Sequence, residues 1–187
     1  MSVNNIILIG PMGVGKSSAA KALANITGLE YIDVDEMRWD YFSSQPDFNG
    51  EMVDKLFDDS KETEAFSYMK PFEARFVVHI LGKYPCGIFD FGAGYTVYED
   101  EKLFDMVKSA LSNYDYVLFL RYSTDSKESI AALYRHTDIP KELYSALNKG
   151  FIESSCNDLL ATHTVDTKGK TIDGVVNSIL DIIQCTQ

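Results

Sequence analysis

The chain has 187 residues and a formal net charge of −11 at pH 7, from 17 Lys and Arg against 28 Asp and Glu. This length suits one domain with a sizeable core, and the acidic balance argues against a nucleic-acid-binding face, which requires clustered cations. No apolar run approaches the roughly 18 residues of a membrane helix and no basic targeting region opens the chain, so we expect a cytoplasmic monomer or homodimer that does not bind membranes.

The first predicted elements enclose a glycine-rich motif. The apolar run at residues 5–9 predicts a buried strand, and residues 16–27, followed by Gly28, predict a helix. Between them, residues 10–17 read GPMGVGKS and match the phosphate-binding loop (P-loop) pattern G-x-x-x-x-G-K-[ST]. Backbone N–H groups of such a turn, together with the positive N-terminal end of the helix, bind anionic phosphates. The sequence therefore predicts a nucleoside triphosphate site.

The residues of this loop have separate expected roles. Its three glycines permit the backbone path, Lys16 places a positive charge at the β- and γ-phosphates, and the Ser17 hydroxyl is the expected Mg²⁺ ligand. We expect the nucleotide to contact Gly10, Met12, Gly13, Val14, Gly15, Lys16, Ser17 and Ser18. ATP is the expected donor, because the sequence shows no guanine-reading motif of the small-GTPase kind.

Two aspartates follow the second predicted strand, at residues 31–32. The carboxyl ends of parallel strands line the ligand crevice, so Asp33 would hold a Mg²⁺-bound water and Asp35 would accept the proton of an attacking hydroxyl. In the structural alternative, Asp35 caps the helix that follows and Asp33 is an ordinary loop acid. The position of the pair behind a phosphate-binding loop favours the functional interpretation.

The third predicted strand, at residues 86–91, supplies another acid. Asp90 lies near the end of this strand, where P-loop proteins place an aspartate that orients Mg²⁺, and is therefore a second metal-site candidate. The small residues Gly92, Ala93 and Gly94 come next and would let a ligand approach the backbone closely. An ordinary glycine turn is the alternative to such a substrate-facing loop.

The rest of the chain alternates helices with two more strands. Helices are predicted at residues 62–81, ended by Gly82, at 100–111 and at about 173–183, and strands near 116–120 and 164–165. This alternation predicts the α/β class, with a five-stranded parallel sheet flanked by helices as in the P-loop kinase fold. We expect residues 1–187 to form a single domain, with an acceptor-binding insertion at about 36–82 and a lid at about 122–160.

The chain has only four arginines with which to bind anionic groups, namely Arg38, Arg75, Arg121 and Arg135. Arg135 lies in the lid segment, where it would stabilise the charge of the transferring phosphoryl group, and a surface position on a helix is the alternative. Arg121 follows the fourth strand and is either structural or in contact with the nucleotide base. The three cysteines lack metal-ligand spacing, and we expect them to be reduced and mostly buried.

Three segments together resemble the shikimate kinase family of small P-loop kinases: residues 6–17, Tyr31-Ile32-Asp33-Val34-Asp35 and Val165-Asp166-Thr167. The resemblance spans most of the chain and is most specific in its N-terminal part. It implies that the adenine-binding loop includes Thr167 and Lys168. It also implies phosphate binding, metal binding and acceptor activation by Lys16, Ser17, Asp33 and Asp35.

The acceptor site departs from the family pattern. The family's triple-glycine substrate loop appears here as residues 92–94, and the arginine that grips the shikimate carboxylate falls at or near Glu73, two residues from Arg75. The second substrate arginine falls near Glu153, and the Arg-Pro pair of the lid is missing. Acids at both positions would repel a carboxylate, so we expect a neutral or cationic hydroxyl compound rather than shikimate. The candidate substrate residues are Asp35, Glu73, Arg75, Gly92, Ala93, Gly94 and Glu153.

The sequence thus predicts an enzyme, an ATP- and Mg²⁺-dependent kinase that transfers a phosphoryl group to a hydroxyl of a small molecule. The expected catalytic residues are Lys16, Asp35 and Arg135. One alternative is a nucleotide or nucleoside kinase, although such enzymes usually bring more arginines to their sites. Another is a catalytically silent ATP-binding sensor or regulatory protein, which the changed acceptor motifs favour and the intact Asp35 argues against.

Overall fold

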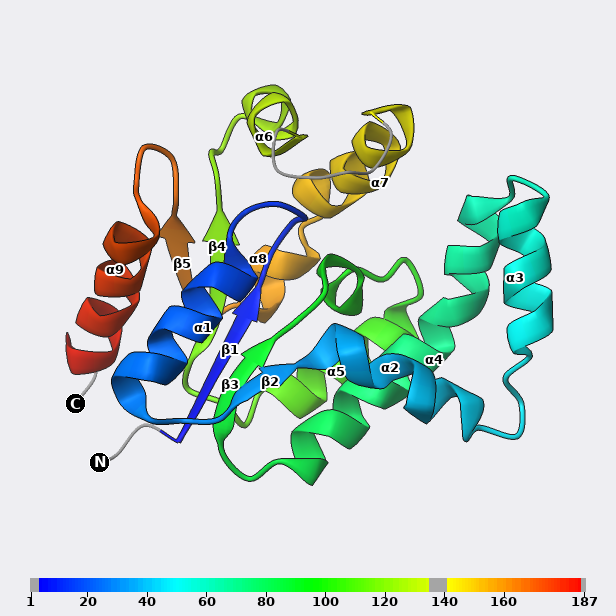
Figure 1. Cartoon of the computed structure of the whole chain (residues 1–187), viewed down its shortest axis with the longest axis horizontal. Helices are drawn as coiled ribbons and strands as arrows, with labels where there is room; N and C mark the ends of the chain where they lie inside the picture. The colour runs from blue at the N-terminus through cyan, green and yellow to red at the C-terminus, as the bar shows by residue number, and fades with distance from the viewer. Residues whose placement is uncertain (1–3, 135–140, 186–187) are drawn as a thin grey trace.

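The structure is a computed structural model that describes residues 4–134 and 141–185 (Figure 1). Its five strands form one sheet in the order β2-β3-β1-β4-β5, and every neighbouring pair is parallel. The predicted fold class is confirmed. In chain order the elements are β1 (Asn5–Ile9), α1 (Lys16–Thr27), β2 (Tyr31–Asp33), α2 (Val34–Ser43), α3 (Gly50–Asp58), α4 (Glu62–Lys83), β3 (Gly87–Asp90), a 3₁₀ turn (Ala93–Thr96), α5 (Glu101–Leu111), β4 (Val117–Arg121), α6 (Ser126–Leu133), α7 (Lys141–Glu153), α8 (Cys156–Leu160), β5 (His163–Asp166) and α9 (Ile172–Cys185).

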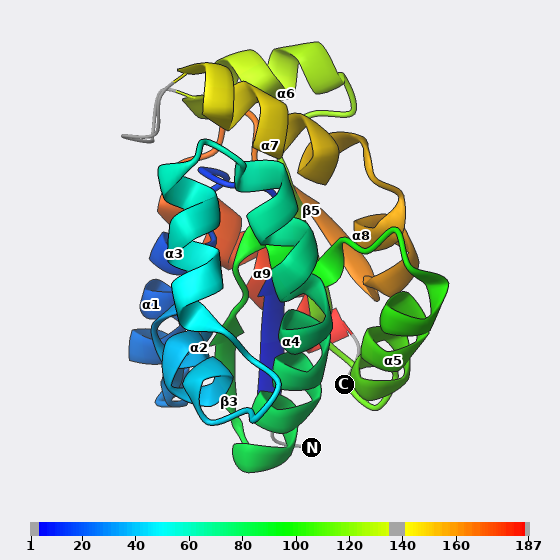
Figure 2. The same cartoon turned by 90° about the vertical axis from the view of Figure 1, so that its right-hand side faces the viewer.

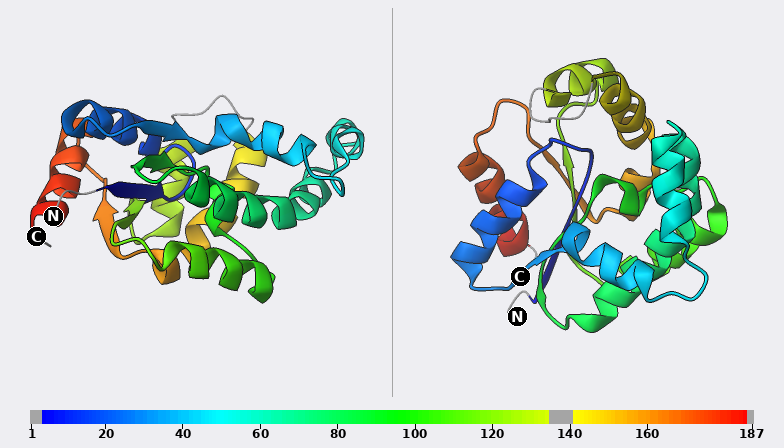
Figure 3. Two further views of the ribbon diagram at one scale, coloured as in Figure 1. Left: turned by 90° about the horizontal axis from the view of Figure 1, so that it is seen from below. Right: turned by 45° about the vertical axis from the view of Figure 1, so that its right-hand side comes forward.

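Helices cover both faces of this sheet. Successive side chains of a strand point to opposite faces, so Ile7 and Ile9 of β1 join the core beneath α2, α4 and α5. Ile6 and Leu8 join the opposite core, beneath α1 and α9. Figure 3 shows the sheet between these two helical layers. Burial on both faces explains why the central strands are continuous apolar runs rather than alternating ones.

Two helices, α6 and α7, lie across the carboxyl-terminal edge of the sheet (Figures 1 and 2). They pack against each other, and they come from the segment that the sequence identifies as a lid. As expected, the described residues between 124 and 158 form helices and contain no strand. Figure 2 also shows α3 alongside α4, on the part of the chain predicted to bind the acceptor.

Most predicted boundaries agree with the structure within two residues, and one helix end differs for a clear reason. Gly28 ends α1 in the left-handed conformation, with φ of 74°, as a C-terminal glycine should. Gly82, by contrast, lies inside α4, which continues to Lys83. Lys83 is the last residue of the helix. Tyr84 is extended because Pro85 follows it, so the proline and not the glycine stops this helix.

The cysteines are free thiols, as expected, but the expectation that they are mostly buried is wrong. Cys86 and Cys185 are exposed, and Cys156 is partly buried. The exposed pair lies at the ends of elements, Cys86 just before β3 and Cys185 as the last residue of α9. Side chains at such positions project beyond the packed layers.

We predict that Gly10→Ala destabilises the protein more than Gly28→Ala does. Both glycines have positive φ, which costs an alanine about 1–2 kcal/mol, but a Cβ at Gly28 meets open space whereas one at Gly10 would collide with the Leu120 carbonyl. Because the collision adds to this cost, Gly10→Ala should lower the free energy of unfolding, measured in urea, by about 2–5 kcal/mol. Equal losses for the two variants would contradict this account of how β1 enters the loop.

Candidate functional site

The P-loop forms one wall of a cavity of about 600 Å³. Residues 13–18 contribute the loop and the first turn of α1, and Leu133 closes the cavity from α6. The cavity is also lined by Tyr122, Thr167, Lys170, Thr171, Ile172 and Val175. A cavity of this size accommodates a small ligand, and its floor is the N-terminal end of a helix, which favours a phosphate.

Lys16 is buried at the base of this cavity. Its Nζ donates hydrogen bonds to the carbonyl oxygens of Gly10 and Pro11, both at 2.9 Å. Burial lowers the pKa of the Lys16 amine, and the nearby carboxylates of Asp90 and Asp35 oppose that shift. The P-loop lysine and both acids are therefore close enough to interact.

Asp33 and Asp90 form a carboxylate pair beside the P-loop. They are register partners on the adjacent strands β2 and β3, so their side chains leave the sheet next to each other. The Ser17 hydroxyl lies beside the Asp90 carboxyl. Burial raises the pKa of the Asp90 carboxyl, while Ser17 and the Lys16 charge act in the opposite direction. The three predicted metal-site residues thus lie together.

A tyrosine hydroxyl bridges this carboxylate pair. Tyr31 lies two residues before Asp33 on the same face of β2, and its hydroxyl is 3.0 Å from Asp33 Oδ2 and 3.0 Å from Asp90 Oδ2. Burial and the Asp90 charge raise the pKa of the Tyr31 phenol, so the hydroxyl stays protonated and can donate to either carboxylate. Two like charges that would repel each other are in this way linked through one proton.

These residues fit a magnesium ion held jointly with a nucleotide. Among the residues that the structure describes, no group of three His, Cys, Asp or Glu side chains could hold a metal by itself. Mg²⁺ commonly binds through one or two carboxylates together with phosphate oxygens and water. Ser17, Asp33 and Asp90 offer two carboxylates and a hydroxyl next to the phosphate-binding loop, which is such a partial site.

Asp33 also has a structural role. Its Oδ1 accepts a hydrogen bond from the Glu36 N–H at 3.3 Å, so it is the N-cap of α2. The structural alternative, in which Asp35 caps this helix, is wrong, because Asp35 already lies within the first turn of α2. Asp35 therefore does not cap the helix.

The carboxylate of Asp35 lies against the predicted substrate loop. A Cβ placed on Gly92 would be only 2.5 Å from Asp35 Oδ1, so only glycine allows this close approach. Asp35 pairs with Arg38 one turn further along α2, at 3.3 Å, and its side chain is 53% exposed. An accessible carboxylate next to the loop of residues 92–94 is suitably placed to receive a proton from an acceptor.

The same loop is also held by a partly buried ion pair. Lys70 Nζ lies 2.8 Å from Glu73 Oε2 and donates to the Gly94 carbonyl at 2.7 Å. Glu73 therefore lies against the loop of residues 92–94, but it is not the uncompensated acid that the sequence suggests. Because Lys70 neutralises it, the loop is lined by a balanced pair rather than by a free negative charge.

Two other predicted substrate residues do not join this group. Arg75, two residues after Glu73 on α4, pairs with Asp47 at 2.9 Å and covers the Phe72 ring. Residues two apart on a helix do not share a face, which directs Arg75 away from the Lys70 pair. Glu153 is exposed at the end of α7, and its described ion pair, at 4.0 Å, is with Lys149. The contacts described for these two side chains are therefore with other parts of the protein than the loop of residues 92–94.

The predicted base-binding residues divide in a similar way. Thr167 lines the cavity, whereas Lys168 forms an ion pair with Glu128 of α6. Arg121 pairs with Asp166, its register partner on β5, at 2.9 Å, which supports the structural interpretation of this arginine. Arg135, the predicted lid arginine, lies outside the described residues.

Sequence reasoning missed four side chains that surround the acids: Tyr31, Arg38, Lys70 and Tyr95. The Tyr95 hydroxyl is buried beside Arg38, without a hydrogen bond of ordinary geometry. Arg38 and Lys70 each lie three residues from the acid that they pair with, and Tyr31 lies two residues before Asp33 on a strand. These spacings are readable in the sequence once the strands and helices are assigned.

Known proteins resemble this chain in sequence around the P-loop and in overall fold. A family model for the ATPases associated with various cellular activities (AAA) matches residues 6–65. The shikimate kinase of Histophilus somni is 58% identical over 31 residues, which span 17% of this chain and 18% of that protein. The match therefore covers less than a fifth of the length of that relative.

The likeness to solved structures extends along the whole chain. Shikimate kinase from Acinetobacter baumannii in complex with shikimate has a TM-score of 0.67 at 16% identity, covering 100% of this chain and 96% of that one. A gluconokinase from Sinorhizobium meliloti has a TM-score of 0.61 at 16% identity, covering 99% and 94%. The chain has the P-loop kinase fold. The predicted resemblance to the shikimate kinases is confirmed.

Because the Tyr31 hydroxyl lies between the carboxylates of Asp33 and Asp90, we predict that Tyr31→Phe has a metal-dependent effect. In EDTA the variant should lose about 1–2 kcal/mol of unfolding free energy, because two adjacent carboxylates lose a shared hydrogen bond. With ADP present to supply the phosphate oxygens of the site, Mg²⁺ should restore part of this loss by neutralising the same pair. Tyr114→Phe, which loses a bond to the neutral Leu81 carbonyl, is the control and should not respond to Mg²⁺. A loss independent of Mg²⁺ in both variants would refute the bridging role.

We also predict that Lys70→Met destabilises the protein by about 3 kcal/mol, because Glu73, whose side chain is only 8% exposed, loses its partner. The double variant Lys70→Met/Glu73→Leu should recover most of that stability. Lys149→Met breaks an exposed pair on α7 and should cost about 0–1 kcal/mol. Urea unfolding measures all three, and a Lys70→Met loss no larger than that of the control would exclude a structural ion pair at the substrate loop.

Proposed function

We propose that this protein is an ATP-dependent kinase that transfers a phosphoryl group to a hydroxyl of a small molecule. The observation that carries the proposal is the position of Asp35, between the Lys16 of the phosphate-binding loop and the loop of residues 92–94. In-line transfer requires a base that is close to the phosphates and to the acceptor hydroxyl. The kinases with similar folds support the same class of reaction.

The nucleotide would occupy the cavity above the P-loop. Its phosphates would meet the backbone N–H groups of residues 13–18 and the charge of Lys16, with the base between Tyr122, Ile172 and Thr167. Ser17, Asp33 and Asp90 would hold the magnesium ion that accompanies the phosphates. Bound there, the ion would neutralise the charge that develops on the phosphoryl oxygens.

The chain's own residues would then prepare the acceptor. Asp35 would receive the hydroxyl proton, and Arg38 would hold that carboxylate in its orientation through their ion pair. Lys16 would balance the negative charge of the transition state from the opposite side. Burial of Lys16 and of the Asp90 carboxyl strengthens these electrostatic interactions, because they are shielded from water.

We further propose a neutral hydroxyl compound, rather than shikimate, as the acceptor. The position that the resemblance assigns to a carboxylate-binding arginine is Glu73, and the nearest cation, Lys70, is already used by Glu73 and the Gly94 carbonyl. Arg75 is used by Asp47. A substrate carboxylate would therefore have to break an internal pair, whereas a neutral polyol would not. No helix in the described parts of the chain is long and apolar enough to cross a membrane.

The test is a screen for ATP turnover by coupled ADP release, with shikimate and a panel of neutral and amine-bearing hydroxyl metabolites. We expect turnover with a neutral acceptor, and a loss of about 10²–10⁴-fold in Asp35→Asn with unchanged MgADP affinity. Asp40→Asn, an exposed acid on the same helix, is the control and should retain full turnover. MgATP binding without turnover on any acceptor would instead indicate a nucleotide sensor, and turnover of shikimate would refute the acceptor class.

A further inference from the structure

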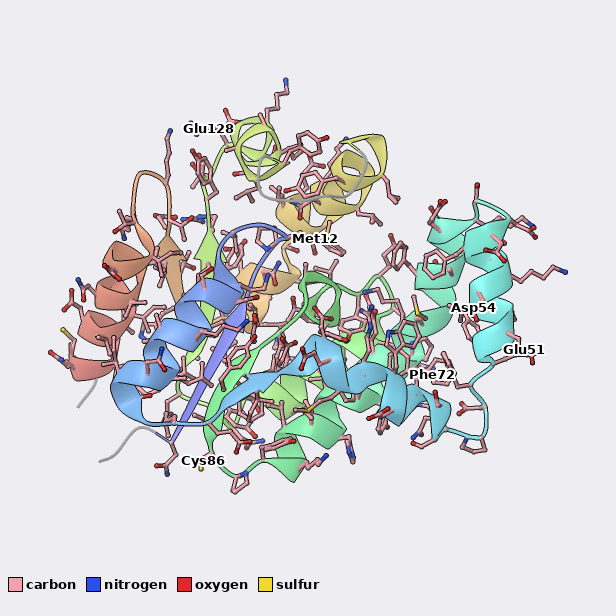
Figure 4. The ribbon with its side chains drawn as sticks, viewed as in Figure 1. Met12, Glu51, Asp54, Phe72, Cys86 and Glu128 are labelled. Atoms are coloured by element: carbon pink, nitrogen blue, oxygen red, sulfur yellow. The ribbon has the colours of Figure 1, made fainter. Side chains whose placement is uncertain are left out.

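The second helix of the lid is joined to the P-loop by a side-chain amide. Asn148 of α7 accepts a hydrogen bond from the Met12 N–H through Oδ1 at 2.9 Å and donates to the Met12 carbonyl through Nδ2 at 3.2 Å. One primary amide thus pairs both backbone groups of a residue 136 positions away in the chain. Figure 4 shows Met12 at the turn of the P-loop next to α7.

Tyr144, one helical turn before Asn148, completes this contact. Its hydroxyl donates to the same Met12 carbonyl at 3.2 Å and accepts from the Asn148 Nδ2. Both side chains are 0% exposed. The Asn148 amide therefore uses its oxygen and both of its N–H bonds, and the tyrosine uses its only proton. A buried polar network with every member paired is rigid, and leaving one member unpaired is costly.

The first lid helix meets the next residue of the loop. A Cβ placed on Gly13 would lie 2.8 Å from the Leu133 carbonyl oxygen at the end of α6, so this carbonyl is packed directly on the glycine. Lys168, from the loop after β5, pairs with Glu128 on the outer side of α6. The two lid helices thus contact adjacent P-loop residues. The contact of α6 with Gly13 is made by packing, whereas the contact of α7 with Met12 is made by hydrogen bonds from Asn148 and Tyr144.

We propose that Asn148 is a positioning residue of the nucleotide site, which fixes the Met12 peptide groups and so couples the docking of α7 to nucleotide binding. Met12 directly precedes the residues that line the cavity, so its orientation sets the direction in which their N–H groups point. The inference rests on the proposed nucleotide binding. Because coupling between two binding events is reciprocal, nucleotide should also tighten the docking of α7.

The first measurement is MgADP affinity by isothermal titration calorimetry on the full chain. Asn148→Leu keeps the approximate volume but removes the hydrogen bonds, and we expect it to weaken MgADP binding about tenfold. Lys149→Gln changes the neighbouring, exposed residue of the same helix and should remain within about twofold of the wild type. Equal affinity for wild type and Asn148→Leu would overturn the inference.

Hydrogen exchange separates positioning from a merely structural role. In the wild type, MgADP should slow amide exchange in α7 as well as in the P-loop. In Asn148→Leu the helix should stay folded, as judged by circular dichroism, but its exchange should no longer respond to MgADP. Persistence of the MgADP response in α7 would show that the helix is coupled to the nucleotide by other contacts, and would refute the role of Asn148.

A milder variant keeps the test decisive if Asn148→Leu does not fold. Tyr144→Phe removes one hydroxyl from the network and should weaken MgADP binding about two- to fivefold, and an unchanged affinity in this variant would count against the inference. Failure of the wild type to bind MgADP would refute the proposed nucleotide site together with this inference. Wild-type binding that both variants retain would refute the inference alone.

Discussion

The parallel pairing of the five strands is the constraint on which the site depends. Because β1, β2 and β3 all run in the same direction, their carboxyl ends emerge at one edge of the sheet, with the P-loop leaving β1 between the acids of β2 and β3 on one side and β4 on the other. The register that pairs Asp33 with Asp90 brings two carboxylates together before any ligand is considered. A chain with antiparallel neighbours would place these residues at opposite ends of the sheet.

A second constraint is charge balance at this edge. The chain is strongly acidic, yet most of the acids near the site have a partner of their own: Asp35 has Arg38, Glu73 has Lys70, and the Asp33–Asp90 pair shares the Tyr31 hydroxyl. Such pairing reduces the repulsion that adjacent carboxylates would otherwise add to the folded state. It also leaves the acceptor loop close to neutral, which is the physical basis for proposing a neutral acceptor.

The sequence predicts the parts of this site that are local. The spacing of Gly10, Gly13, Gly15 and Lys16 identifies the P-loop because the whole motif lies in one turn. The strand before it is a continuous apolar run because both faces of the sheet are buried. Predictions are less accurate where a residue's role depends on segments that are distant from it in the sequence. The charge at Glu73 is misjudged because its compensation depends on which residues of α4 face the substrate loop, and Arg121 is assigned only when its β5 partner is known. The contact between Asn148 and Met12 has no local signal at all, since nothing near either residue points to the other.

The two roles of Asp33 have a consequence for how this site tolerates change. The same carboxylate faces Asp90 beside the P-loop and caps the helix that carries Asp35 and Arg38. An asparagine at position 33 would preserve the cap but remove the charge, whereas an alanine would remove both and loosen the first turn of α2. An alanine at this position would therefore disturb the proposed metal site and the helix that carries the proposed base in a single step, whereas an asparagine would disturb the metal site alone.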